Sequence, residues 1–73
     1  MRRIRKISVG VDYKDCFCVL VGQSTHGGNK VDCIVYNKEK EMYDIFIKDK
    51  DGVVQFWKDF RKDSVISTED FIV

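Results

Sequence analysis

Four side chains in the sequence are of the types that bind zinc: Cys16, Cys18, His26 and Cys33. Structural zinc sites usually hold two cysteines in a Cys-x-x-Cys turn, which brings both sulfurs round one ion. Cys16 and Cys18 are separated by one residue instead, and in a strand their thiols would lie about 6 to 7 Å apart on one face. We therefore expect the cysteines to act as small hydrophobic residues, and we predict no metal site and no cofactor.

The sequence offers few groups for catalysis. Its one histidine, His26, lies in a glycine-rich segment beside Ser24 and Thr25. A catalytic serine or cysteine needs a base held against it, and no Gly-x-Ser-x-Gly motif or other nucleophile signature is present. The acidic residues are dispersed over predicted turns and suggest no carboxylate pair. We predict that the protein has no catalytic residues and is not an enzyme.

A polar segment over residues 22–30 has groups that suit phosphate. It supplies an amide, two hydroxyls, an imidazole and an ammonium group, from Gln23, Ser24, Thr25, His26 and Lys30. Its glycines allow successive backbone N–H groups to converge on an anion. The segment is not a P-loop, because the Gly-Lys-[Ser/Thr] ending and the following helix are missing. It is either a phosphate-binding loop or a solvated hairpin loop.

Positive charge is concentrated at the start of the chain. Arg2, Arg3, Arg5 and Lys6 supply four of the 13 basic residues, and all 12 acidic residues follow them. The planar guanidinium group of arginine suits phosphate and also stacks on bases. Arg5 is therefore a candidate ligand contact, and a solvated N-terminus is the alternative.

Aromatic residues make up 12% of the chain, and most of them must pack in the core. Tyr13, in a predicted turn, and Trp57, which precedes Lys58, are the two that we expect near the surface. There a ring can stack on a nucleotide base. For Trp57 the alternative is an anchor in the core or at a subunit interface.

Length and composition restrict the class of protein. Seventy-three residues make one small domain, residues 1–73. The net charge of +1 argues against general nucleic-acid binding. No run of about 18 apolar residues is present to span a membrane, and no apolar stretch follows the basic start to make a secretion signal. The odd number of cysteines, three, favours reduced thiols and a cytoplasmic protein.

The hydrophobic pattern repeats mostly every second residue and is rich in β-branched and aromatic residues, which predicts strands. We expect strands over residues 4–11, 16–23, 30–36, 42–48 and 53–60. Residues 65–73 form either a short strand or one helical turn. Residues 53–60 also fit helical spacing, but the turn predicted just before them favours a strand. The fold is predicted to be mainly β, a single small antiparallel sheet or an open barrel of five to six strands with little helix.

The pattern also predicts which side chains share a face of the sheet. Residues 16–23 are apolar on both faces and are expected to form a central strand. Alternation places Ile7 and Val11 on one face of the first strand, and Val31 and Ile34 on opposite faces of the third. No amphipathic helix is available to cover the second face. We therefore expect a second copy of the chain to pack there in a homo-oligomer, or the sheet to curl into a small barrel.

Three short motifs carry a resemblance to a known family. They are residues 6–13 (Lys-Ile-Ser-Val-Gly-Val-Asp-Tyr), residues 21–23 (Val-Gly-Gln) and the pair Trp57 and Lys58. With them the chain resembles small β-rich accessory proteins of large lytic tailed phages, in particular the cyclic-nucleotide sponges of anti-CBASS counter-defence. The resemblance implies a viral protein that evades immunity in the host cytoplasm. It also implies a homo-oligomer that binds a cyclic di- or oligonucleotide in pockets between subunits without cutting it.

The candidate ligand-binding residues follow from the chemistry of such a ligand, which carries phosphates, riboses and bases. For phosphate and ribose they are Arg5, Ser24, Thr25, His26 and Lys58; for base stacking they are Tyr13 and Trp57; for a base edge it is Gln23. A different class of function stays open. The chain is then a small interaction protein that inhibits a host enzyme by direct protein–protein binding, through an exposed strand edge and a tyrosine-rich face.

Overall fold

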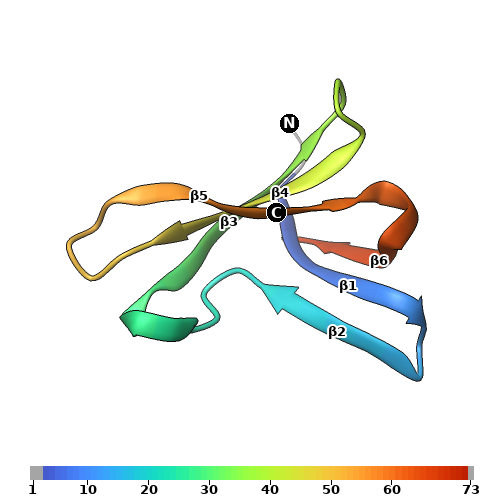
Figure 1. The fold of residues 1–73 in the computed structure, drawn as a ribbon, viewed down its shortest axis with the longest axis horizontal. Helices are drawn as coiled ribbons and strands as arrows, with labels where there is room; N and C mark the ends of the chain where they lie inside the picture. Colours follow the sequence, from blue (N-terminus) through green and yellow to red (C-terminus); the bar gives the residue numbers. More distant parts are fainter. Residues whose placement is uncertain (1–2, 73) are drawn as a thin grey trace.

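The computed structural model describes residues 3–72, which form six strands and two short 3₁₀ turns (Figure 1). The elements in chain order are β1 (Ile4–Asp12), β2 (Asp15–Leu20), η1 (His26–Gly28), β3 (Lys30–Asn37), β4 (Met42–Lys48), β5 (Val54–Arg61), η2 (Lys62–Ser64) and β6 (Val65–Asp70). All the strand pairs are antiparallel. The predicted fold class, a mainly β protein with one small antiparallel sheet and little helix, is confirmed.

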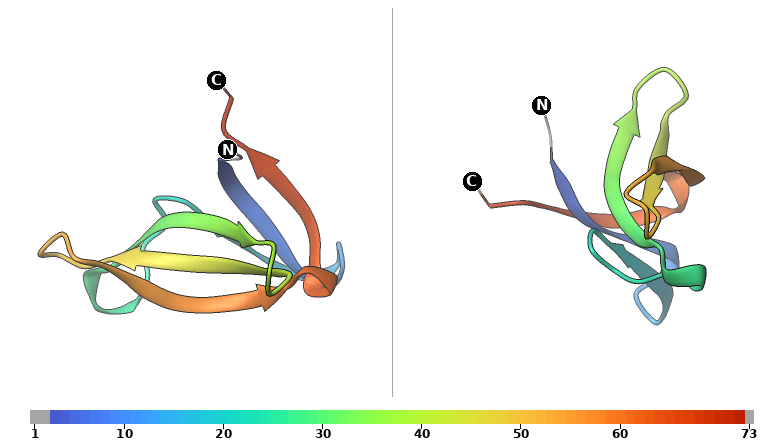
Figure 2. Two further views of the ribbon diagram at one scale, coloured as in Figure 1. Left: turned by 90° about the horizontal axis from the view of Figure 1, so that it is seen from above. Right: turned by 90° about the vertical axis from the view of Figure 1, so that its left-hand side faces the viewer.

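The sheet bends sharply at one point. Hydrogen-bonded neighbours follow the order β2-β1-β3-β4-β5, and β6 pairs with β1 as well. β1 and β3 share a single bridge, between Ile4 and Ile34. Two three-stranded parts, β2-β1-β6 and β3-β4-β5, are therefore set at an angle to each other (Figure 2). The hydrogen-bonded path ends at β2 and β5, so each of these strands keeps one edge that no other described strand pairs.

The core is built from both parts of the sheet. It consists of buried β-branched residues: Ile4, Ile7, Val9, Val19, Val31, Ile34 and Ile45. Ile7 and Ile45 are fully buried. β-branched side chains pack well on a pleated surface, and removing their apolar surface from water stabilises the fold by about 25 cal/mol per Å².

The expected turns are present and are held by aspartate side chains. Oδ1 of Asp12 accepts hydrogen bonds from the backbone N–H groups of Lys14 and Asp15, both at 2.9 Å. Oδ1 of Asp49 does the same in the turn before β5. The strand prediction for residues 53–60 is confirmed by β5, and the tail forms a strand, β6, rather than a helical turn. Within residues 3–72 no helix is long and apolar enough to cross a membrane.

The prediction of a central strand over residues 16–23 is wrong, because β2 lies at one end of the sheet. The strand stops at Leu20, where the chain turns and the N–H of Gln23 donates to the carbonyl of Leu20 at 3.1 Å. The outer face of β2 carries Cys16, Cys18 and Leu20, which are half-buried. The apolar character of both faces therefore does not require a central position.

Two predicted faces are also wrong, because bulges interrupt the alternation. On β1, Gly10 pairs with Cys16 and Asp12 with Asp15, so Val11 is an extra residue and is 86% exposed. On β3 the extra residue is Asp32, between the pairs that Val31 and Cys33 make with β4. A bulge moves the residues after it to the opposite face, and Val31 and Ile34 are consequently both buried in the core.

Candidate functional site

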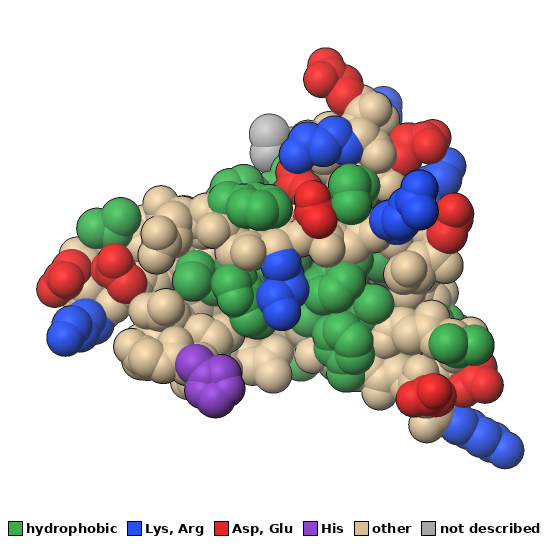
Figure 3. Space-filling view, viewed as in Figure 1, with side chains coloured by type: hydrophobic (Ala, Val, Ile, Leu, Met, Phe, Trp, Pro, Cys, Tyr) green, Lys and Arg blue, Asp and Glu red, His purple; other side chains and the backbone are tan. Residues whose placement is uncertain are grey.

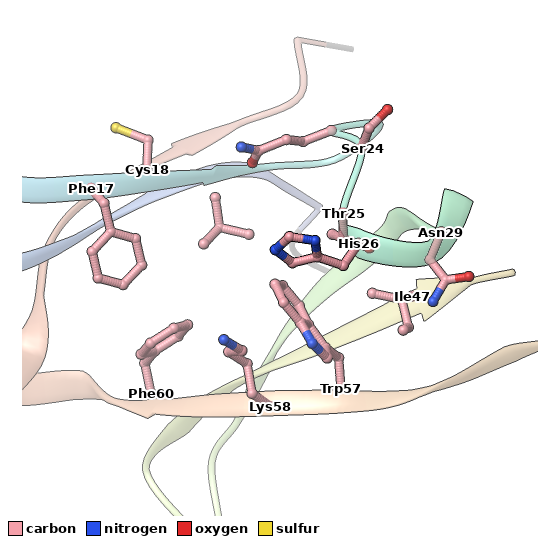
Figure 4. Close-up of a pocket in the computed structure, with 12 residues that line it drawn as sticks. Phe17, Cys18, Ser24, Thr25, His26, Asn29, Ile47, Trp57, Lys58 and Phe60 are labelled. Atoms are coloured by element: carbon pink, nitrogen blue, oxygen red, sulfur yellow. The ribbon is translucent and has the colours of Figure 1, made fainter.

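A pocket of about 590 Å³ lies between β2 and β5, the two ends of the hydrogen-bonded path (Figure 4). Phe17 and Val19 of β2 line one side, and Trp57, Lys58 and Phe60 of β5 line the other. Residues of the loop between β2 and β3 complete the wall. The pocket exists because β2 and β5 do not pair, so that side chains and not a backbone ladder border the space between them.

A β-bulge in β5 sets the direction of Trp57 and Lys58. Ile45 pairs with Lys58, whereas the next residue on β4, Phe46, pairs with Phe56, so Trp57 is the extra residue. Neighbouring side chains of a regular strand point to opposite faces, and the extra residue cancels that alternation. Trp57 and Lys58 therefore both point into the pocket (Figure 4), and Nζ of Lys58 lies 4.1 Å from the centroid of the Trp57 ring.

The loop between β2 and β3 places His26 at the pocket. The backbone N–H of Thr25 donates to the carbonyl of Asn29 at 2.8 Å, which closes the loop. Inside it the chain makes the 3₁₀ turn η1, where Gly27 has a φ of 76°. Glycine adopts this left-handed conformation without steric cost. The tight turn holds the imidazole of His26 over the space between β2 and β5 (Figure 4).

The residues around the pocket favour an anionic ligand with an apolar or aromatic part. None of its twelve lining residues is acidic, although the chain contains 12 Asp and Glu. Lys58 supplies a positive charge, and the imidazole of His26 can take part in hydrogen bonds. Hydrophobic side chains gather on the same face of the molecule, round a central basic side chain and beside the histidine (Figure 3). The site therefore combines flat apolar surface with groups that attract phosphate or carboxylate.

Six of the eight predicted ligand-binding residues line this pocket: Gln23, Ser24, Thr25, His26, Trp57 and Lys58. Their positions within it differ. Oε1 of Gln23 accepts a hydrogen bond from the backbone N–H of Leu20 at 3.1 Å, which fixes its amide at the loop. The hydroxyl of Ser24 points away from the space between β2 and β5 (Figure 4).

Arg5 and Tyr13 lie elsewhere. The guanidinium group of Arg5 forms an ion pair with the carboxylate of Glu69 on β6. This contact lowers the pKa of the Glu69 carboxyl, first through the hydrogen bond and then through the positive charge of Arg5. Tyr13 is 75% exposed in the turn between β1 and β2. Arg2, which belongs to the same basic start of the chain, lies outside the described residues.

Sequence reasoning missed the apolar part of the pocket. Phe17 and Phe60 line it, and their rings meet edge to face with centroids 5.7 Å apart. The sequence predicts only that most aromatic residues pack in the core. No signal in the sequence places them at a pocket, because the approach of β2 to β5 depends on the bend of the whole sheet.

The three cysteines are free and half-buried. Cys33 lies on β3, and its thiol has a raised pKa, chiefly because burial disfavours the thiolate and then because the Asp32 carboxylate repels it. Within residues 3–72 no group of three His, Cys, Asp or Glu side chains is close enough to hold a metal ion.

Comparison with known proteins gives no relative from which a function can be transferred. No protein-family model matches the chain, and neither a curated protein nor a solved structure matches it.

Proposed function

We propose that the protein is not an enzyme and sequesters a cyclic di- or oligonucleotide signal in the pocket between β2 and β5. The observation that carries this proposal is the composition of the wall. It brings aromatic rings, the ammonium group of Lys58 and the imidazole of His26 together and contains no carboxylate. A nucleotide needs flat apolar surface for its base and positive charge or N–H donors for its phosphate.

The size of the pocket agrees with such a ligand. Sites for small molecules and cofactors measure about 300 to 1,000 Å³, and this one measures about 590 Å³. The wall offers no nucleophile held against a base: His26 is its only histidine, and no hydrogen bond between His26 and Cys18, Ser24 or Thr25 is found among the described residues. Binding without cleavage is the behaviour that this arrangement supports.

Assembly into a homo-oligomer is part of the proposal. Apolar side chains remain on the surface, with Val35 46%, Val54 46% and Phe56 50% exposed. Among the strands of residues 3–72, β2 and β5 each keep one edge unpaired. A second copy packed beside the pocket would add to the residues that one chain supplies to its wall. The further proposal, a counter-defence protein of the host cytoplasm, rests on the resemblance to phage sponges.

A thermal-shift screen tests the proposal. A ligand that binds only the folded chain at 100 times its Kd stabilises it by about 2.7 kcal/mol, so cyclic di-AMP, cyclic di-GMP or a cyclic GMP–AMP isomer should raise the Tm. Lys58→Gln should abolish most of the shift, and Lys50→Gln, in the turn before β5, should not. The nucleotide should be recovered intact after denaturation. No shift with any member of such a panel would refute the proposal.

The second candidate is a protein–protein inhibitor of a host enzyme, which the exposed apolar face of β3-β4-β5 favours. Phe56 on β5 and Val35 on β3 lie on the face opposite the core. Such a protein would retain a specific host enzyme on an affinity column, and Phe56→Ser would release it. Under the nucleotide proposal Phe56→Ser leaves the ligand-induced Tm shift unchanged, so the two candidates separate.

A further inference from the structure

The ammonium group of Lys58 occupies the ring face of Trp57 in the free protein. Nζ lies 4.1 Å from the ring centroid, within the range of a cation–π interaction. Both side chains line the pocket. The bulge in β5 produces the contact, because in a regular strand these neighbours would point to opposite faces.

From this contact we infer that Lys58 is a specificity-determining residue: it favours a base that is joined to a phosphate over a base alone, because the phosphate receives the ammonium group that the base displaces from the Trp57 ring. This inference rests on the proposed function and names the ligand class more closely: a base and a phosphate joined in one molecule. A base alone must displace the ammonium group into water. A phosphate alone draws Lys58 away and leaves the ring face empty.

The ammonium group of Lys58 can make two alternative interactions, one with the Trp57 ring and one with a phosphate, and their relative strengths decide which it makes. A cation over an exposed indole contributes modestly, whereas a charge-assisted hydrogen bond to phosphate is stronger. Trp57 is 37% exposed, and Lys58 is exposed too, so both can move without disturbing the core. The wall contains no carboxylate that could capture the displaced ammonium group. The phosphate of the ligand is therefore its partner when a base stacks on Trp57.

Replacing Lys58 by methionine separates this role from a general loss of charge. Lys58→Met keeps a side chain of similar length and uncovers the ring face. The affinity for adenosine should rise about two- to fivefold, because the base no longer displaces a cation. The affinity for cyclic di-AMP should fall at least about tenfold, because its phosphate loses the ammonium group. Opposite changes for the two ligands are not expected from a merely structural residue.

The single tryptophan of the chain provides the readout. Trp57 emission is titrated with cyclic di-AMP, adenosine and sodium phosphate, in the wild type, in Lys58→Met and in Lys50→Met. The last variant removes the same charge outside the pocket and should behave as the wild type. The Tm of each variant is measured without ligand, and an unchanged value shows that the fold is intact.

Each outcome decides the inference. If Lys58→Met lowers the affinity for adenosine and for cyclic di-AMP alike, or leaves the affinity for adenosine unchanged, the inference is wrong. Binding of cyclic di-AMP by the wild type would still support the proposed function. If neither compound changes Trp57 emission in any of the proteins, the inference is overturned, and the thermal-shift panel alone judges the proposed function. Opposite shifts in the two affinities, with Lys50→Met unchanged, support it.

Discussion

The rings of Phe17 on β2 and Phe60 on β5 meet edge to face, with centroids 5.7 Å apart. They join the two strands at which the hydrogen-bonded path ends, and no strand ladder connects these strands. Phe60 also packs against the core, whereas Phe17 is 53% exposed. The contact therefore ties the two sides of the pocket together through side chains.

Removing this contact should impair the pocket more than the fold. Phe17→Ala should lower the free energy of unfolding by about 0.5 to 1.5 kcal/mol for the edge-to-face pair, in addition to the loss of the buried part of the ring, and should weaken nucleotide binding. Phe56→Ala is the matched control, because Phe56 makes a similar contact with Phe46 at 5.9 Å and is 50% exposed. Urea unfolding and calorimetric titration measure both effects. Equal losses of affinity in the two variants would contradict this role of Phe17.

Gly10 lies where no other residue fits. A Cβ atom built on it would be 2.3 Å from the carbonyl oxygen of Asp15 and 2.7 Å from Cα of Cys16. Both are backbone atoms of the paired strand, so Gly10→Ala should force β1 and β2 apart and destabilise the protein by about 1 to 3 kcal/mol. Val11→Ala, at the neighbouring residue that is 86% exposed, should change stability little. Urea midpoints that are the same for both variants would show that the hairpin tolerates the insertion.

The thiol of Cys33 should react slowly. Burial first, and the charge of Asp32 second, raise its pKa, and only the thiolate is nucleophilic. At pH 8 iodoacetamide should therefore alkylate Cys33 more slowly than free cysteine, as peptide mass spectrometry can follow. Asp32→Asn should accelerate the reaction without reaching the free rate, because burial remains.

Lys48→Gln is the control for this experiment. Nζ of Lys48 lies 3.7 Å from Oδ1 of Asp32, so the variant breaks the same ion pair but keeps the carboxylate. It should not accelerate alkylation. A faster reaction in Lys48→Gln than in Asp32→Asn would mean that the salt bridge, rather than the negative charge, governs Cys33.

The ion pair of Arg5 and Glu69 should make stability depend on acidic pH. Arg5 lowers the pKa of the Glu69 carboxyl below its ordinary value of 4.5 in the folded state. The pair therefore stabilises the fold above that value, and the contribution is lost as the pH falls through the lowered pKa. Glu69→Gln should be slightly less stable than the wild type at pH 7, and the difference should shrink at an acidic pH, as Glu69 of the folded wild type takes up a proton.

The effect of Glu69→Gln should be small, because the two side chains are 41% and 52% exposed and salt screens such pairs. Urea unfolding at both pH values, with Glu39→Gln in the turn before β4 as the control, measures it. A difference from the wild type that persists undiminished at the acidic pH would mean that Glu69 acts through something other than its charge.

The turns and most strands were predictable from the sequence because they depend on local contacts. Asp12 and Asp49 bond to backbone N–H groups two to four residues away, and β4 coincides with the predicted residues 42–48. Part of the site is local as well. His26 and its polar neighbours share one loop, and Trp57 and Lys58 are adjacent, so their chemistry could be recognised before their arrangement was known.

The tertiary structure decided three features. β2 lies at an edge of the sheet, the ring of Phe17 contacts that of Phe60, and Arg5 forms an ion pair with Glu69. Arg5 and Glu69 are 64 residues apart, and no local pattern relates them. Bulges at Val11, Asp32 and Trp57 also have no signature of their own, because an extra residue is defined by the partner strand. Short-range hydrogen bonds and side-chain alternation can be derived from the order of residues. Strand register and the bend of the sheet depend instead on how distant segments pack. The register and the bend determine where the pocket lies.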